Sequence, residues 1–452
     1  MEACSTTQKG MLAATGSGVV FVALALAAYF LRSPLWRLPV EPGARAADVL
    51  ARSPVADQAA NPTDLRMRSA QAFVERAPAD PRGYTLLCAA YMQKARETGD
   101  FGMNAKAQAA LDRALRIAPG DLEVLKYQAL LLLTYHRFNE ALDVARRAQQ
   151  LRPRDDDLLG ALTDALVELG DYEAAAESAQ AMIDLRPDAA SYARVSYQRS
   201  LRGDTAGAIA AMRLAVQAAN PGNPEEGAWC RVHLGYELMN AGKLAEAEHE
   251  FDLALATFPQ YHMALAAKAR ARAAAGDATA AIQLYQRAQD RVPLPDTVAA
   301  LGDLYAKLGR STDAERQYAL LDFIGRSGAP GSATYSRQLA LFWADHGMHL
   351  DEALALAQQE RAARSDIYTC DTLAWCLFKK GRLDEAKAAI GDALRLGTRD
   401  ARLYYHAGMI YKVLGDRAAA VRYLRLALDT NATFDLLQAD VARSMLTEMG
   451  VQ

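Results

Sequence analysis

Small and apolar positions recur at a regular interval along most of this chain. Prolines that end a helical pattern are evenly spaced in two series, Pro119, Pro153 and Pro187, then Pro259 and Pro293. A small residue near the start of each second helix recurs at nearly the same spacing, as Ala107, Ala141, Ala175, Ala208, Ala247, Ala281, Ala314, Ala353, Ala386 and Ala420. This period predicts paired antiparallel helices that stack into an array, because one pair alone cannot bury its apolar face.

Turn residues follow the same interval. Glycine precedes a polar residue at Gly170, Gly242, Gly381 and Gly415, where we expect the first helix of a pair to end in the left-handed conformation. Two of the intervals, from Ala208 to Ala247 and from Ala314 to Ala353, are longer because they contain extended loops, at 220–227 and 325–332. Small residues inside a pair allow its helices to approach closely, and larger ones fill the groove left by the next pair.

Several units resemble the tetratricopeptide repeat family, whose period of about 34 residues matches the proline spacing. One unit has the family's key positions as Leu234, Gly235, Leu238, Ala247, Phe251, Ala254 and Pro259, and the next has Leu301, Gly302, Tyr305, Ala314 and Tyr318. The resemblance covers about residues 80–430. It implies an all-α fold, a right-handed α-solenoid of about ten stacked helical hairpins.

Domain boundaries follow from this period. We assign residues 64–432 to the repeat array and residues 433–452 to a C-terminal capping helix that covers the last apolar face. Three units depart from the pattern. The first has an insertion near 98–104, the fourth ends at Asn220, and the eighth, at about 332–364, lacks the closing proline.

The N-terminus contains an uncharged apolar run. After a tail at residues 1–11, residues 12–31 have the length of a transmembrane helix, with Lys9 before them and Arg32 after them. A cleaved signal segment is the alternative, because Ala23-Leu24-Ala25 fits a cleavage pattern. We expect a single-pass anchor in a bacterial inner membrane, or a secreted or periplasmic protein if cleavage occurs. The side of the membrane stays open, and residues 32–63 are a proline-containing linker.

Composition and charge favour some classes of function and fold over others. The formal net charge of −3 argues against a nucleic-acid-binding protein, in which we would expect a basic excess. Ala, Leu, Arg, Glu and Gln dominate long stretches, which favours helices, and the Ala/Arg-rich sequence resembles bacterial repeat proteins. The five scattered cysteines do not form a disulfide framework, so we interpret them as small apolar core residues.

The sequence contains no nucleotide-binding or hydrolase signature that would predict an enzyme, and no cofactor is expected. His346 and His349 are predicted to lie at a hairpin turn where Gly347 breaks the geometry of a shared metal site. Asp155-Asp156-Asp157 resembles a calcium cluster, but these residues follow Pro153 at a helix start. Capping and dipole compensation explain them more simply, so no metal site is predicted.

The family resemblance places function on the concave face, which the first helix of each unit lines. Setting the units in phase predicts that a set of aromatic and charged residues faces it: Lys126, Asp164, Tyr197, Trp229, Tyr236, Arg270, Asp303, Tyr335, Phe342, Trp375 and Tyr405. Such surfaces suit protein or peptide ligands. We therefore predict a membrane-tethered scaffold that helps to assemble an envelope complex. The alternatives are an exported small-molecule sensor or non-obvious enzyme, and a self-associating structural protein.

Overall fold

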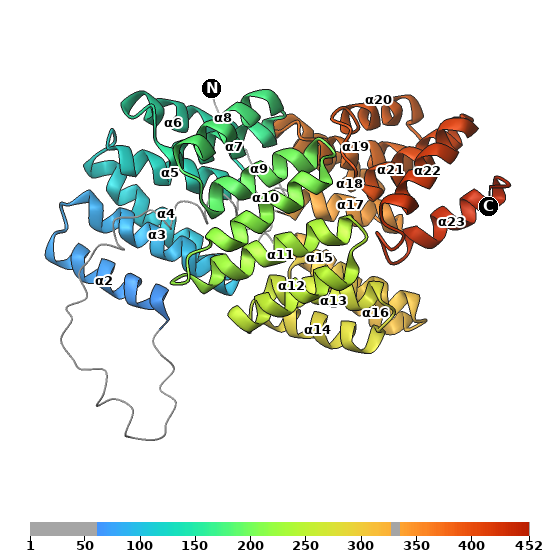
Figure 1. Cartoon of the computed structure of the whole chain (residues 1–452), viewed down its shortest axis with the longest axis horizontal. Coiled ribbons are helices and arrows are strands. Elements are labelled where there is room, and N and C mark those ends of the chain that lie inside the picture. Colours follow the sequence, from blue (N-terminus) through green and yellow to red (C-terminus); the bar gives the residue numbers. More distant parts are fainter. Residues whose placement is uncertain (1–60, 327–334, 452) are drawn as a thin grey trace, which may run out of the picture.

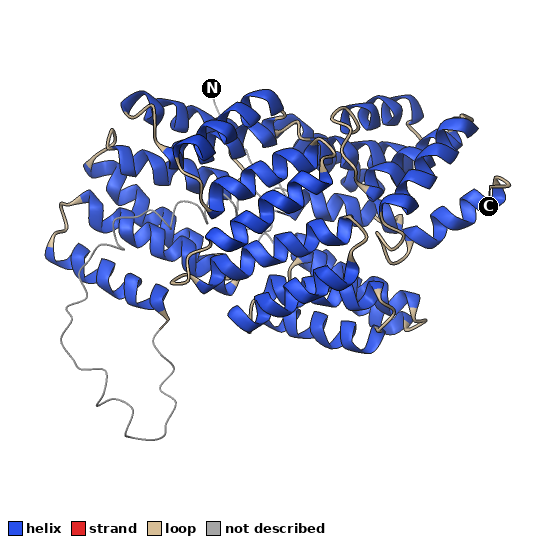
Figure 2. Ribbon diagram, viewed as in Figure 1, coloured by secondary structure: helices blue, strands red, loops and turns tan. Residues whose placement is uncertain are grey.

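The computed structural model describes residues 61–326 and 335–451, and all regular secondary structure in these ranges is helical (Figure 1, Figure 2). The first helices of ten hairpins are α3 (Pro81–Thr98), α5 (Leu122–Thr134), α7 (Asp156–Leu169), α9 (Ala189–Leu201), α11 (Pro224–Asn240), α13 (His262–Ala274), α15 (Pro295–Lys307), α17 (Ser336–His346), α19 (Ile367–Lys379) and α21 (Ala401–Val413). The second helices are α4 (Gly102–Ile117), α6 (Phe138–Leu151), α8 (Tyr172–Leu185), α10 (Thr205–Ala218), α12 (Leu244–Thr257), α14 (Ala278–Arg291), α16 (Ser311–Arg326), α18 (Leu350–Ala363), α20 (Leu383–Ala393) and α22 (Arg417–Thr430). Helices α2 (Pro62–Arg76) and α23 (Gln438–Glu448) flank this α-solenoid, so the all-α prediction is confirmed for the described residues.

Local sequence signals explain where the helices end. Each of the five closing prolines lies just beyond a second helix; Pro119, for example, follows the end of α4 at Ile117. The turn glycines adopt positive φ angles, such as 80° at Gly170 and 79° at Gly415, as predicted. Aspartates cap many of the helix starts, where a side-chain oxygen accepts a hydrogen bond from a main-chain N–H.

Close helix contact inside the hairpins depends on small residues. All ten of the periodic alanines are buried, and most are completely inaccessible. A Cβ atom added to Gly235 would lie 2.2 Å from Cε1 of Phe251, and one added to Gly408 would lie 2.7 Å from Cγ of Leu424. The two helices of these hairpins therefore cross at a distance that only glycine permits.

Both ends of the predicted array need adjustment. Helix α2 begins at Pro62, slightly before the predicted start, because Asn61 caps it, and it packs on α3. The terminal helix begins at Gln438 rather than 433, because the Asp435 carboxylate accepts hydrogen bonds from the N–H groups of Leu437 and Gln438. The predicted anchor at residues 12–31 and most of the 32–63 linker lie outside the described residues. Among the helices that are described, none combines the length and apolar character that a membrane crossing requires.

Successive turns of the superhelix touch one another. The carbonyl oxygen of Leu201, at the end of α9, accepts a hydrogen bond from Thr398 in the loop before α21. Glu225 at the start of α11 accepts a hydrogen bond from Gln93 of α3. The N–H groups of Ser365 and Ile367, at the start of α19, bond to Glu168 O and to the Tyr172 hydroxyl, and Figure 1 shows α19 beside α7 and α8. These contacts add long-range packing to the neighbour-to-neighbour packing of a repeat array.

A buried ion cluster holds two of these turns together. The Arg364 guanidinium lies 2.6 Å from Glu168 on α7, 3.1 Å from Glu360 and 3.6 Å from Asp366. Arg337 adds a second cation, 2.9 Å from Asp366. Burial alone would raise the pKa of Asp366, but the two arginines outweigh burial and lower it. Asp366 is therefore ionised and paired inside the contact.

Candidate functional site

The nine predicted partner-binding residues differ in accessibility. Arg270 is exposed, and Tyr197 and Tyr236 are half-buried. The remaining six are less than a tenth exposed: Lys126, Trp229, Tyr335, Phe342, Trp375 and Tyr405. A buried side chain in a close-packed interior reaches a ligand only if its neighbours repack. Partner contact by these six residues stays a prediction, and the accessible three are better placed for it.

The buried aromatic residues form the core of the last units. The Trp375 ring stacks on His406 with ring centroids 4.1 Å apart, and its Nε1 donates a 2.7 Å hydrogen bond to Asp345. His406 Nδ1 lies 2.8 Å from the Asp371 carboxylate. Replacing Trp375 would therefore disturb packing as well as any surface that it contributes to.

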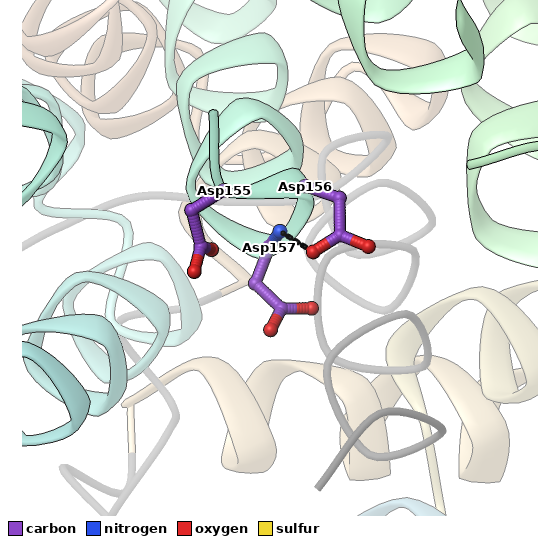
Figure 3. A group of neighbouring side chains, drawn as sticks. All are labelled: Asp155, Asp156 and Asp157. Carbon is purple, nitrogen blue, oxygen red and sulfur yellow. Dashed lines mark hydrogen bonds between the residues drawn. The ribbon is translucent and has the colours of Figure 1, made fainter. Parts of the chain in front are cut away.

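The three aspartates at 155–157 form an acidic run at the start of α7 (Figure 3). The Asp155 carboxylate accepts a hydrogen bond from Leu158 N at 3.1 Å, and that of Asp156 accepts one from Asp157 N. The Lys126 ammonium lies 2.6 Å from Asp155 and 3.4 Å from Asp157. Although burial lowers the pKa of Lys126, nearby carboxylates raise it to about 12. The predicted capping role is confirmed, and Lys126, Arg152 and Arg186 already pair with the carboxylates.

His346 and His349 occupy the turn between α17 and α18, as predicted, and they have different partners. His346 Nε2 lies 2.8 Å from Asp303 and its Nδ1 lies 2.9 Å from the Phe342 carbonyl oxygen. His349 has a φ angle of 42° and lies 3.6 Å from Asp322. The two imidazoles therefore do not share a site.

Charged groups from three first helices, Arg270 of α13, Lys307 of α15 and Arg402 of α21, reach the same short stretch at residues 434–436. On α15, desolvation raises the pKa of Asp296, and the charges of Arg402 of α21, Arg337 of α17 and Arg270 of α13 act to lower it. Burial raises the pKa of Tyr236 on α11, the Arg270 charge acts to lower it and the Asp296 charge raises it further. We call this surface the inner face, comprising Tyr236, Arg270, Asp296, Asp303, Lys307, Asp345, Arg402 and Tyr405.

The residues Asp296, Lys307, Asp345 and Arg402 were not among the sequence predictions. A signal for two of them was present. Asp296 and Arg402 precede the small residues Gly302 and Gly408 by the same spacing with which Trp229 precedes Gly235. Equivalent positions in a repeat face the same way, so the repeat phase that selected Trp229 also selects these charged residues.

A groove of about 720 Å³ lies between α4, α5 and α6, away from the inner face. Its apolar side chains include Leu111, Leu132 and Val144, and its rim mixes acidic and basic residues. One pair, Arg137 and Glu140, is joined by an ion pair of 2.5 Å. The groove is lined mostly by the second helices α4 and α6, whereas the inner face combines first helices of several units, so the inner face is the stronger candidate.

Comparison with protein families identifies the repeat. Residues 161–224 and 233–294 match one tetratricopeptide repeat model, and residues 401–434 match another. These three segments carry tetratricopeptide repeats. The matched segments include α13 and α21, so they contribute Arg270, Arg402 and Tyr405 to the inner face. Comparison with curated proteins found no match.

Solved structures of similar shape are distant in sequence. A human IFIT1 dimer with PPP-AAAA has 13% identity and a TM-score of 0.46, covering 81% of this chain and 87% of that one. PilW, described as a widely conserved type IV pilus biogenesis factor, has 18% identity and a TM-score of 0.39, covering 47% and 96%. A tetratricopeptide repeat protein from Parabacteroides merdae has 20% identity and a TM-score of 0.33, covering 57% and 97%. We draw no conclusion about ligands from these similarities.

Proposed function

We propose that this chain is a scaffold that binds segments of partner proteins on its inner face and does not catalyse a reaction. The observation that carries the proposal is that Arg270, Lys307 and Arg402, from three first helices, all contact the short stretch at residues 434–436. A tyrosine ring supplies contact area with a polar end, and the charged groups orient a peptide. Tetratricopeptide repeats generally mediate protein–protein interactions, and solenoid curvature creates concave surfaces for this purpose.

The proposal includes a membrane tether at residues 12–31, with a bacterial inner membrane as the location and assembly of a cell-envelope complex as the role. Its support is the sequence, in which an uncharged apolar run separates Lys9 from Arg32. If this segment is a cleaved signal, the same scaffold acts in the periplasm or outside the cell.

A small-molecule sensor or enzyme is the second candidate. It is favoured by the raised pKa values of Asp296 and Asp345, because perturbed carboxyl groups cluster at functional sites. However, the nearby thiol is that of Cys376. Burial raises the pKa of this thiol, and the Asp345 charge raises it further. A protonated, buried thiol is a poor nucleophile. The binding role therefore has the stronger support.

A cross-linked pull-down from membranes tests the scaffold. The inner-face variant carries Tyr236→Ala, Arg270→Ala and Arg402→Ala, which spare the buried Phe342 and Trp375 rings. The matched control carries Arg146→Ala and Arg147→Ala at the exposed rim of the outer groove. Both variants are first checked for unchanged helicity by circular dichroism.

We expect the unaltered chain and the control to capture the same proteins and the inner-face variant to lose them. Retention of those proteins by the inner-face variant would contradict the proposal. If the unaltered chain captures nothing, while a pool of small metabolites raises its melting temperature, support passes to the sensor.

A further inference from the structure

The chain's own C-terminal segment, residues 431–440, lies on the inner face. It leaves α22 after Thr430 and leads into α23, which stands at the end of the array in Figure 1. Its contacts reach α13 and α15, which are 129 to 164 residues earlier in the chain. A link that only joined α22 to a capping helix would not need these distant partners.

Two cations of the inner face hold the main chain of this segment. Arg270 Nη2 donates a hydrogen bond of 3.1 Å to the carbonyl oxygen of Phe434. Lys307 Nζ donates one of 2.7 Å to the carbonyl oxygen of Leu436. Main-chain carbonyls are common to all peptides, so these contacts recognise an extended or turned chain rather than a particular sequence.

Side chains of the segment add selectivity. The Phe434 ring is 4% exposed and lies 5.6 Å from the Tyr405 ring. The Asp435 carboxylate lies 3.9 Å from the Arg402 guanidinium. Leu436 packs against the apolar cluster that includes Leu304. The inner face therefore receives an aromatic residue, an acidic residue and an apolar residue in that order.

The charged contacts of this segment are accessible to solvent. Arg402 and Asp435 are 39% and 18% exposed, and Lys307 and its partner Asp440 are 42% and 59% exposed. Exposed ion pairs contribute little because water and salt screen them. A competing chain with the same groups could replace this segment without leaving buried charges unpaired.

We propose that the inner face between α13 and α21 is a binding site for partner peptides in which an aromatic residue is followed by Asp and a large apolar residue. The C-terminal segment occupies this site in the free protein, and a partner displaces it. This inference rests on the proposed scaffold function and specifies the chemistry of its partner. The balance of positive and negative groups on the inner face suits a peptide with one acidic residue.

The test measures binding of a labelled synthetic peptide with the sequence of residues 429–442 to the full chain by fluorescence anisotropy. Phe434→Ala removes the anchoring ring and releases the segment. We expect this variant to bind the peptide at least about tenfold more tightly than the unaltered chain, since no internal competitor remains. Adding Arg402→Ala to it should weaken binding by up to about fivefold, because the guanidinium opposite the peptide's aspartate is lost from a partly exposed ion pair. Thr433→Ala, an exposed change in the same segment, is the control and should bind as the unaltered chain does.

Hydrogen exchange of the unaltered chain gives a second measurement that does not depend on a variant. Excess peptide should accelerate exchange of the Leu437 and Gln438 amides while α22 stays protected. Equal affinity for the Phe434→Ala and unaltered chains, or an affinity that Arg402→Ala leaves unchanged, would overturn the inference. Concentration-dependent dimers without peptide binding would also overturn it, because a second copy would then be the occupant. If the pull-down still loses its partners in the inner-face variant, only this inference fails and the scaffold function stands.

Discussion

Arg364 Nη1 donates a 2.6 Å hydrogen bond to Glu168 Oε2 although the residues are 196 positions apart, and their side chains are 0% and 3% exposed. The pair joins α7 to the loop between α18 and α19. Removal of one partner from a buried ion pair leaves the other charge without compensation, which is more destabilising than loss of an exposed pair.

Arg364→Met should therefore lower the free energy of unfolding by about 3–5 kcal/mol, because it leaves Glu168, Glu360 and Asp366 with only Arg337 nearby. Urea unfolding measures the loss, and hydrogen exchange should locate it at the ends of α7 and α18. Arg382→Met, which breaks the exposed pair with Glu385, is the control and should cost less than about 1 kcal/mol. Equal losses in the two variants would mean that the turns are held by other contacts.

Glu226 should make stability depend on pH. Its side chain is buried, and burial raises its pKa from 4.5 to about 8. Between these values the folded state keeps a proton that the unfolded state releases. The resulting stabilisation is complete below pH 4.5 and is lost as the pH rises through 8.

Glu226→Gln removes this dependence because it cannot ionise. Thermal unfolding should show similar stability for both chains at about pH 4.5 and a variant that is more stable by roughly 3–5 kcal/mol at about pH 8.5. Glu246→Gln, at an exposed position where Lys243 lowers the pKa, should not show this gain. If the stability difference between the Glu226→Gln variant and the unaltered chain did not change with pH, titration of Glu226 would be ruled out as its cause.

Alanine substitutions at Gly235 and Gly391 should change the free energy of unfolding in opposite directions. The new methyl group at 235 would meet Phe251 at 2.2 Å, whereas at Gly391 on α20 nothing lies within 4 Å. Gly235→Ala should lose about 1–3 kcal/mol through overpacking, and Gly391→Ala should gain about 0.5–1 kcal/mol from helix propensity. Denaturant titration distinguishes them. The double variant Gly235→Ala, Phe251→Leu should lose less free energy of unfolding than the two single variants together, because the smaller side chain relieves the overlap. Strictly additive losses would argue against this contact.

Asp155 combines capping with ion pairing, and two substitutions separate these roles. Asp155→Asn keeps a capping oxygen but loses the charge opposite Lys126, whereas Asp155→Ala loses both. The alanine variant should be less stable than the asparagine variant by about 1–2 kcal/mol in thermal unfolding. Millimolar calcium should leave the melting temperature of the unaltered chain unchanged, because Lys126, Arg152 and Arg186 already pair with these carboxylates. A calcium-dependent rise would show that the ion displaces the ammonium group.

The helical repeat could be predicted from the sequence because its signals are local. Pro119 follows the end of α4 closely, and Gly170 has a φ angle of 80°, both as the period indicated. The start of α23 was placed too early because the capping oxygen of Asp435 was not recognised. Such a cap changes a boundary without disturbing the pattern of apolar positions.

The inner face was only partly predictable. The repeat phase gives the direction of each side chain, so Tyr236 and Arg270 were placed on a first-helix face and Asp296 could have been. The repeat phase does not predict how deeply a ring such as Trp229 is buried, because burial depends on the neighbouring elements that cover the ring. Contacts such as Arg270 with Phe434 depend on small rotations between units, which add up over many hairpins before two turns meet.

The contact between successive turns also affects how the chain forms during synthesis. Hairpins near α7 leave the ribosome and can fold when Arg364 has not yet been made. At about 5–20 residues per second, the 196 residues between Glu168 and Arg364 take about 10–40 s to translate. During that time Glu168 and the surface around it face water. The Glu168 carboxylate is hydrated until the second turn arrives, and the Arg364 guanidinium then takes the place of that water.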